Sequence, residues 1–111
     1  MLANEYQLNA HRSAIYPSEM AIEYIALGLA SEAGEVAGKV KKGIRDGKHW
    51  SGEQREDHRR SLLSELSDVL WYSAELCTVL GVTLQDVMQY NLDKLADRQR
   101  RGVLGGSGDA R

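Results

Sequence analysis

One long, uninterrupted pattern of apolar residues constrains the fold of this chain more than any other feature of its sequence. Between Ser18 and about Ile44, apolar side chains recur at helical spacing for about seven turns. They are Ile22, Ile25, Ala26, Leu29, Ala33, Val36, Ala37, Val40 and Ile44. The single proline of the chain, Pro17, stands just before this segment. We therefore expect one long α-helix here, with Ser18 as its N-cap, and few interruptions elsewhere.

Similar patterns predict three further helices. The expected segments are Ala3 to Ser13, Arg60 to Val79, and Leu84 to Arg100. Thr83 is a favourable N-cap for the last of them. The polar stretch from Arg45 to about Arg59 predicts a loop, and no alternating pattern indicates a β-strand. The sequence therefore predicts an all-α fold, a protomer of the four-helix bundle type.

The length of the chain fits a single small domain. Its 111 residues accommodate one domain over residues 1–101, followed by a glycine-rich tail over residues 102–111. The helices are few, and the two longest are apolar over more than one face. Because so small a chain buries little surface alone, we expect a homodimer or homotetramer to complete the core.

Charge and cysteine content exclude several classes of protein. With 14 Lys+Arg against 16 Asp+Glu the net charge is -2, which disfavours a nucleic-acid partner. No apolar run approaches the length of a membrane span, and the N-terminus does not resemble a signal peptide. The only cysteine, Cys77, offers neither an internal disulfide nor a zinc site. We expect a cytoplasmic protein with no membrane partner.

Two pairs of acidic residues share the same spacing. Glu32 and Glu35 lie in the first long segment, and Glu65 and Asp68 lie in the next. Residues three apart share one face of a helix, and each pair flanks the apolar stripe of its own helix. Antiparallel packing of the two helices would bring the four carboxylates together. Such a set of oxygen ligands suits Mg²⁺ or Mn²⁺.

Two other interpretations of these acids compete with a magnesium site. Paired acids on helices are commonly solvated surface residues that contact neighbouring lysines. A di-iron centre is the second, but it requires Glu-x-x-His motifs, which His11, His49 and His58 do not supply. The equal spacing of the two pairs in adjacent helices favours the magnesium site over solvated acids.

Three segments of the chain resemble one known family. They are GLASEAGEVAGKVKKGIRDGK (Gly28–Lys48), LLSELSDVLWY (Leu62–Tyr72) and NLDKLADRQRRG (Asn91–Gly102). Together they resemble the MazG-like nucleoside triphosphate pyrophosphohydrolases of the all-α NTP pyrophosphatase superfamily. The family pattern is E-E-x-x-E on one helix and E-x-x-D on the next. Four acids match it, whereas Ser31 stands in place of the first acid. The matching residues are Glu32, Glu35, Glu65 and Asp68.

The resemblance implies a Mg²⁺-dependent enzyme, with Mn²⁺ able to substitute. Such an enzyme would cleave a (d)NTP to (d)NMP and pyrophosphate, and so control or clean the nucleotide pool. The implied metal ligands and catalytic residues are Glu32, Glu35, Glu65 and Asp68. Because of Ser31, the identity of the general base stays open. So does an alternative function, that of a non-catalytic helical oligomer that senses a nucleotide or a metal.

Cationic and amide side chains are predicted to hold the phosphates and sugar. Lys39 lies one turn beyond Glu35 on the same flank of its helix. A second set follows an i, i+3, i+7 stripe on the last helix, where the resemblance places phosphate and sugar contacts. It consists of Asn91, Lys94 and Arg98. A solvated surface is the alternative for Lys39 and Arg98.

Further residues are predicted to contact the base. Tyr72, one turn beyond Asp68, is a candidate for sugar or base contact. The resemblance places Gln7 and Tyr16 among the base-recognition residues. Core packing is the alternative for the two tyrosines. Gly28 lies on the flank of the acids, where a missing side chain is predicted to leave room for substrate.

Overall fold

The computed structural model describes residues 1–47 and 55–111, and within these ranges it contains helices and no β-strand. The α-helices are α1 (Ala3–His11), α2 (Ala21–Arg45), α3 (Arg55–Leu80) and α4 (Leu84–Arg100), and a short 3-10 helix, η1 (Ser18–Met20), precedes α2. The prediction of an all-α fold is confirmed. No helix in the described part of the chain has both the length and the apolarity needed to cross a membrane.

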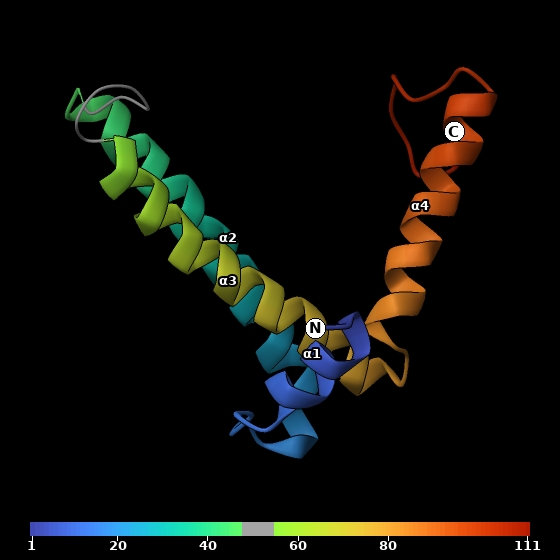
Figure 1. The fold of residues 1–111 in the computed structure, drawn as a ribbon, viewed down its shortest axis with the longest axis horizontal. Helices are drawn as coiled ribbons and strands as arrows, with labels where there is room; N and C mark the ends of the chain where they lie inside the picture. The colour runs from blue at the N-terminus through green and yellow to red at the C-terminus, as the bar shows by residue number, and fades with distance from the viewer. Residues whose placement is uncertain (48–54) are drawn as a thin grey trace.

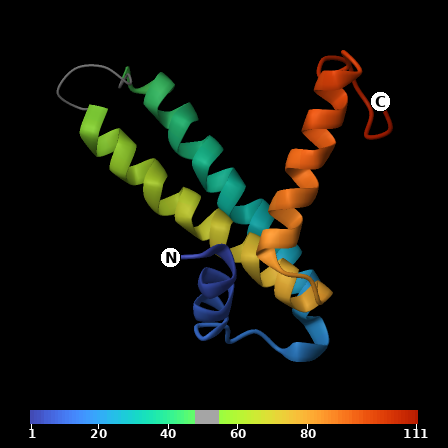
Figure 2. The ribbon, with the colours of Figure 1, turned by 45° about the vertical axis from the view of Figure 1, so that its right-hand side comes forward.

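Helices α2 and α3 form a long antiparallel hairpin (Figure 1). Helix α1 packs on α3, and α4 leads away from the end of α3, so that the hairpin and α4 form two arms of a V (Figures 1 and 2). Among the described residues, α4 contacts α1 and α3 but not α2. The buried core lies at the junction of α1, α3 and α4, where Tyr6 and Trp71 pack against it. It consists of Ala10, Ala74, Cys77 and Leu84.

The predicted start of α2 at Ser18 is wrong. Pro17 has extended backbone angles and leads into the 3-10 turn, which Ser18 begins. The α-helix starts only at Ala21, and its N-cap residue, Met20, makes no side-chain capping bond. The proline therefore sets the start of a tighter turn, which delays the α-helix by about one turn.

Helix α3 also starts elsewhere than predicted, at Arg55 instead of Arg60. Glu56 places negative charge in the first turn, where the helix dipole favours it. Its carboxylate also forms ion pairs with Arg59 and Arg60 at i, i+3 and i, i+4 spacing. The predicted loop is shorter as a result, and residues 48–54 of it lie outside the described residues.

The other helix ends are close to the prediction. Helix α1 ends at His11 instead of Ser13. Helix α4 has the predicted bounds, and the Thr83 side chain accepts a hydrogen bond of 3.1 Å from the backbone N–H of Asp86. The predicted N-cap of α4 is therefore confirmed.

The glycine-rich tail folds back on the end of α4 (Figure 1). The Arg111 guanidinium donates hydrogen bonds to backbone carbonyls of the tail, at Val103, Leu104, Gly105 and Gly108. Gly106 and Gly108 have positive φ angles, which let the tail turn around this side chain. Arg98 Nη2 donates to the carbonyl of Asp109 at 2.8 Å. The tail and the last turns of α4 therefore form one hydrogen-bonded unit.

Candidate active site

Three carboxylates converge between the two helices of the hairpin. Glu32 comes from α2, and Glu65 and Asp68 come from one face of α3 because they are three residues apart. One carboxylate oxygen of each residue lies within 4.8 Å of the others. Glu32 and Glu65 are half-buried, and Asp68 is exposed. Hard divalent cations such as Mg²⁺ and Mn²⁺ prefer oxygen ligands gathered in this way.

Glu35 stands beside this group without belonging to it. Its side chain is exposed. Its negative charge nevertheless contributes to raising the pKa of Glu32. The structure thus brings together three of the four acids that were predicted as metal ligands, and it leaves Glu35 next to them.

Lys39 joins the carboxylates to the next turn of α3. Its Nζ lies 2.7 Å from Glu65 Oε1 and donates a hydrogen bond of 3.1 Å to the carbonyl of Ser61. Hydrogen bonding from Lys39 is the main reason why the pKa of Glu65 is lowered. The predicted phosphate-binding lysine therefore lies at the carboxylate group, where it holds Glu65 in its charged form.

Glu32 experiences the opposite effect. Partial burial raises its pKa, and the neighbouring carboxylates of Glu65 and Asp68 raise it further. Burial disfavours the charged form, and repulsion among like charges acts in the same direction because a proton on Glu32 removes one of the negative charges. A divalent cation would relieve the same repulsion. Both the charge distribution and the donor atoms therefore suit a cation site.

A small pocket next to Lys39 extends toward the last turn of α2. Its volume is about 160 Å³. Its lining residues are Lys39, Lys42, Gly43, Asp46, His58 and Ser61. Two lysines bring positive charge to this side of the carboxylates. This end of the hairpin is therefore suited to an anionic group such as phosphate.

Tyr72 lies on the other side of the carboxylates and corrects the prediction for Gly28. A Cβ atom added to Gly28 would lie 2.1 Å from Tyr72 Cε1, so the tyrosine ring already fills the space left by the missing side chain. Partial burial raises the pKa of Tyr72, and contact with Tyr24 and the charges of Glu32 and Asp68 add to this effect. Gly28 therefore makes room for Tyr72 rather than for substrate.

Aromatic rings continue from Tyr72 toward the start of α2. The Tyr72 and Tyr24 ring centroids are 6.4 Å apart, and those of Tyr24 and Tyr16 are 5.5 Å apart. The two sides of the carboxylate group along the hairpin therefore differ in chemical character. Aromatic side chains lie on one side of the carboxylates, and Lys39 and Lys42 lie on the other.

Tyr16 leads to a buried acid, Glu75, which the sequence analysis missed. The Tyr16 hydroxyl donates to Glu75 Oε2 at 2.5 Å, and His11 Nδ1 lies 3.0 Å from the same oxygen. Burial and the hydrogen bond to Glu75 raise the pKa of Tyr16 to about 12. One sequence signal exists: Glu75 is seven residues after Asp68, so it returns to the same face of α3.

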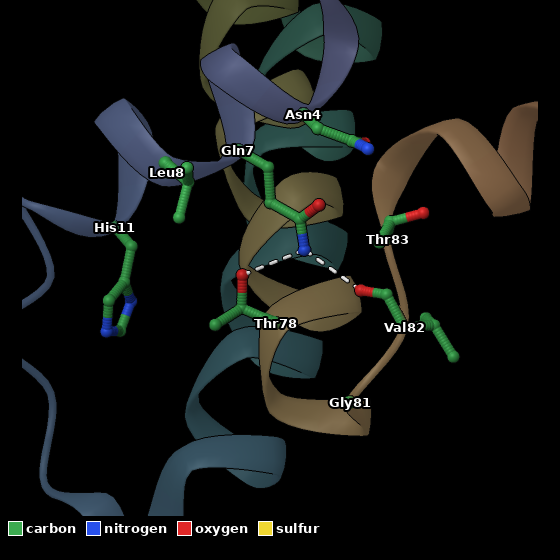
Figure 3. A pocket seen from close by; sticks show the side chains of 8 residues that line it. All are labelled: Asn4, Gln7, Leu8, His11, Thr78, Gly81, Val82 and Thr83. Carbon is green, nitrogen blue, oxygen red and sulfur yellow. Dashed lines mark hydrogen bonds between the residues drawn. The ribbon is translucent and has the colours of Figure 1, made fainter.

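Gln7 connects α1 to the turn between α3 and α4 (Figure 3). Its Nε2 donates to Thr78 Oγ1 at 3.1 Å and to the carbonyl of Val82 at 2.9 Å, and its Oε1 accepts from the Leu84 N–H at 2.7 Å. Both amide N–H groups are therefore engaged within the protein. A pocket of about 360 Å³ surrounds this side chain. It is lined by Asn4, Gln7, Leu8, His11, Thr78, Gly81, Val82 and Thr83.

The predicted phosphate contacts on α4 are not brought to the carboxylates within the protomer. Asn91 and Lys94 are exposed on the second arm of the V (Figure 2). Lys94 Nζ lies 5.8 Å from the centre of the Tyr90 ring. Arg98 is buried, and it is bound to the tail through Asp109. The predicted metal ligands therefore lie on the hairpin, and the predicted phosphate contacts of α4 lie on the other arm of the V.

Comparison with known proteins shows the family of the chain. The chain is 46% identical over 112 residues to the "Gene 37 protein" of Mycobacterium phage L5, with 96% of each chain covered. It is 35% identical over 78 residues to the "Uncharacterized protein YvdC" of Bacillus subtilis (strain 168), which covers 68% of this chain and 74% of the relative. No solved structure matches. The family profile of the MazG nucleotide pyrophosphohydrolase domain matches residues 21–103, which include the whole hairpin and α4, and the chain belongs to that family.

Proposed function

We propose that this protein is a Mg²⁺-dependent pyrophosphohydrolase that cleaves a (d)NTP to (d)NMP and pyrophosphate, and so controls or cleans the nucleotide pool. The observation that carries the proposal is the convergence of Glu32, Glu65 and Asp68 in a chain of the MazG family. A triphosphate is strongly anionic, and its hydrolysis depends mainly on positioning and on stabilising negative charge.

The residues present fit a bound Mg²⁺, with Mn²⁺ as a substitute. Glu32, Glu65 and Asp68 would hold the ion through carboxylate oxygens, and the negative charge of Glu35, which also acts on Glu32, would add to the attraction for a cation. When bound, the ion supplies positive charge that offsets the charge of the phosphates. The raised pKa of Glu32, which follows from its partial burial and from the neighbouring carboxylates, supports this assignment.

The side chains around the carboxylates support one orientation of the nucleotide. Lys39 and Lys42 would bind the phosphates that leave as pyrophosphate. Tyr72 and Tyr16 would contact the sugar and base on the aromatic side. Lys39 would exchange its contact with Glu65 for a phosphate oxygen, because a cation on the carboxylates removes their need for the ammonium group.

A homodimer or homotetramer is part of the proposal. Leu63, Leu66 and Leu70 are about half-exposed along α3 and line an apolar pocket. Exposed apolar surface of this extent is typical of an interface. A second copy would cover it, and it would also provide an α4 with Asn91 and Lys94 for the open side of the hairpin. Light scattering coupled to size-exclusion chromatography tests this, and a species of only 12.3 kDa would contradict it.

The test of activity is an incubation with Mg²⁺ and a panel of nucleotides, with pyrophosphate and orthophosphate resolved. We expect a monophosphate and pyrophosphate, and loss of both with a chelator. Glu65→Gln should abolish turnover, whereas Glu19→Gln, an exposed acid before α2, should leave it unchanged. Orthophosphate as product, or full activity in Glu65→Gln, would contradict the proposal.

A non-catalytic nucleotide or metal sensor is the second candidate, and Ser31 favours it because the family pattern has an acid at that position. The same panel separates the two functions. A sensor would bind nucleotide or Mn²⁺ in calorimetry with no product formed. Glu35→Gln is informative for both, since a loss of metal binding would place Glu35 among the ligands.

A further inference from the structure

Glu75 is the most deeply buried ionisable side chain near the site. Its exposed fraction is 0%, although it lies on a helix whose other acids are half-buried or exposed. Oε2 is occupied by the Tyr16 hydroxyl and by His11. Oε1 is buried and has no hydrogen-bond partner among residues 1–47 and 55–111. A buried carboxylate oxygen without a donor is costly, so Oε1 is an acceptor that a bound ligand could satisfy.

The position of Glu75 relates it to the candidate site. Asp68, Tyr72 and Glu75 follow one face of α3, and the seven residues from Asp68 to Glu75 span about 10 Å of helix. The rings of Tyr72, Tyr24 and Tyr16 lie along this span. Burial raises the pKa of Tyr6, and the negative charges of Asp68 and Glu75 both add to this effect, in line with two acids that face the same region.

The arrangement of lysines on one side of the carboxylates and aromatic rings on the other determines which part of a nucleotide would reach Glu75. The two lysines lie on the opposite side of the carboxylates, so in the proposed orientation the phosphates would extend away from Glu75 and the base would extend toward it. His11 covers Oε2 and is itself 54% exposed. The acid therefore lies one side chain below the surface, and a shift of the side chains around it would bring the edge of a base within reach of Oε1.

We propose that Glu75 determines base specificity by accepting a hydrogen bond at Oε1 from the exocyclic amino group of the nucleobase. A carboxylate accepts hydrogen bonds and donates none, so it pairs with an amino group and repels a keto oxygen at the same position. The substrates are therefore nucleotides of amino-bearing bases, in preference to their keto counterparts. This inference rests on the proposed function, because it names the substrate class of the same site.

The first experiment uses wild-type protein and two pairs of substrates that differ in this group. The pairs are dCTP with dUTP, and dATP with dITP. We expect kcat/KM to be at least tenfold higher for the amino member of the faster pair, because the keto member would leave a buried polar atom unpaired. Equal values, or a preference for the keto member, would overturn the inference without the need for any variant.

The second experiment uses Glu75→Gln, which preserves the size of the side chain and an acceptor for Tyr16. The amide can donate as well as accept, so the amino preference should fall to within about threefold or reverse. Glu19→Gln is the matched control and should retain the wild-type ratio. An unchanged ratio in Glu75→Gln would show that Glu75 does not contact the base. Should Glu75→Gln fail to melt cooperatively, Glu75→Asp, which keeps the carboxylate but withdraws it by one methylene group, replaces it with the same expected loss of preference.

Binding measurements separate this inference from the proposed function. Calorimetry with non-hydrolysable α,β-methylene analogues of dCTP and dUTP, in the presence of Mg²⁺, reports base preference without turnover. If no nucleotide yields pyrophosphate but the dCTP analogue binds at least tenfold more tightly, the proposed function fails and the role of Glu75 stands. If pyrophosphate is released but both analogues bind equally, the role of Glu75 fails and the proposed function stands.

Discussion

The packing of Gly28 against Tyr72 can be tested with one methyl group. In Gly28→Ala, the new Cβ would lie 2.1 Å from Tyr72 Cε1, 2.4 Å from Cζ and 2.7 Å from Cδ1. No real structure tolerates such distances, so the ring must move. Movement is costly here because the ring contacts Trp71 edge-on, with centroids 4.9 Å apart, and also packs near Tyr24.

The expected magnitude combines two opposing effects. Replacing glycine by alanine inside a helix contributes about 1 kcal/mol of stability. Overpacking a well-filled site costs about 1–3 kcal/mol. Gly28→Ala should therefore range from neutral to about 2 kcal/mol less stable than wild type. Gly34→Ala is the matched control, since it lies in the same helix with nothing within 4 Å of the added Cβ, and it should gain about 1 kcal/mol.

Thermal unfolding followed by circular dichroism measures the difference. The two variants should differ by about 1–3 kcal/mol, which for a domain of this size separates their melting temperatures by several degrees. In a Tyr72→Ala background the penalty of Gly28→Ala should disappear, because the clashing ring is absent. Light scattering should show the same oligomer for all variants. If Gly28→Ala is as stable as Gly34→Ala, or if its penalty persists without Tyr72, the reasoning is refuted.

Three further predictions concern the metal site and the junction of helices. Lys39→Met should bind Mn²⁺ about two- to fivefold more tightly in calorimetry, because the ion pair with Glu65 no longer competes with the metal; weaker binding would contradict this. The pKa of Glu32 is raised, so a proton competes with the metal at a higher pH than it would at an ordinary glutamate. The affinity for Mn²⁺ should therefore fall as the pH drops through that raised pKa. Glu32→Gln should remove this pH dependence. Gln7→Ala should lower the free energy of unfolding by about 1–3 kcal/mol in urea titrations, because three hydrogen bonds are lost, to the end of α3, to the turn after it and to the start of α4. An unchanged midpoint would show that water replaces them.

Local patterns in the sequence were sufficient to predict where the α-helices lie. The sequence predicted all four α-helices but not η1. Helix α4 was predicted with its bounds because its N-cap bond is local, from the N–H of Asp86 to the Thr83 side chain. The two wrong helix starts have local causes that were misread. Pro17 introduces a 3-10 turn rather than the α-helix itself, and the charged segment from Arg55 forms helix because Glu56 pairs with arginines one turn away.

The candidate site was predictable only in part. Spacing within each helix and the expected antiparallel packing predicted that the four acids converge, and the structure brings three of them together, Glu32, Glu65 and Asp68. Spacing could not show that Lys39 pairs with Glu65, because this contact depends on how two helices are aligned. It could not separate Glu35 from the other acids for the same reason.

The sequence by itself determined which segments are helical and which acidic faces they present, because these properties depend on interactions within a few residues. Only the tertiary structure decided what the single side chains do. Glu75 is buried because α1 and the segment before α2 cover it, and Gln7 is engaged by residues more than 70 positions away. Gly28 leaves space for the ring of Tyr72, which lies on another helix. Such roles arise from contacts between distant parts of the chain, and no local period encodes them.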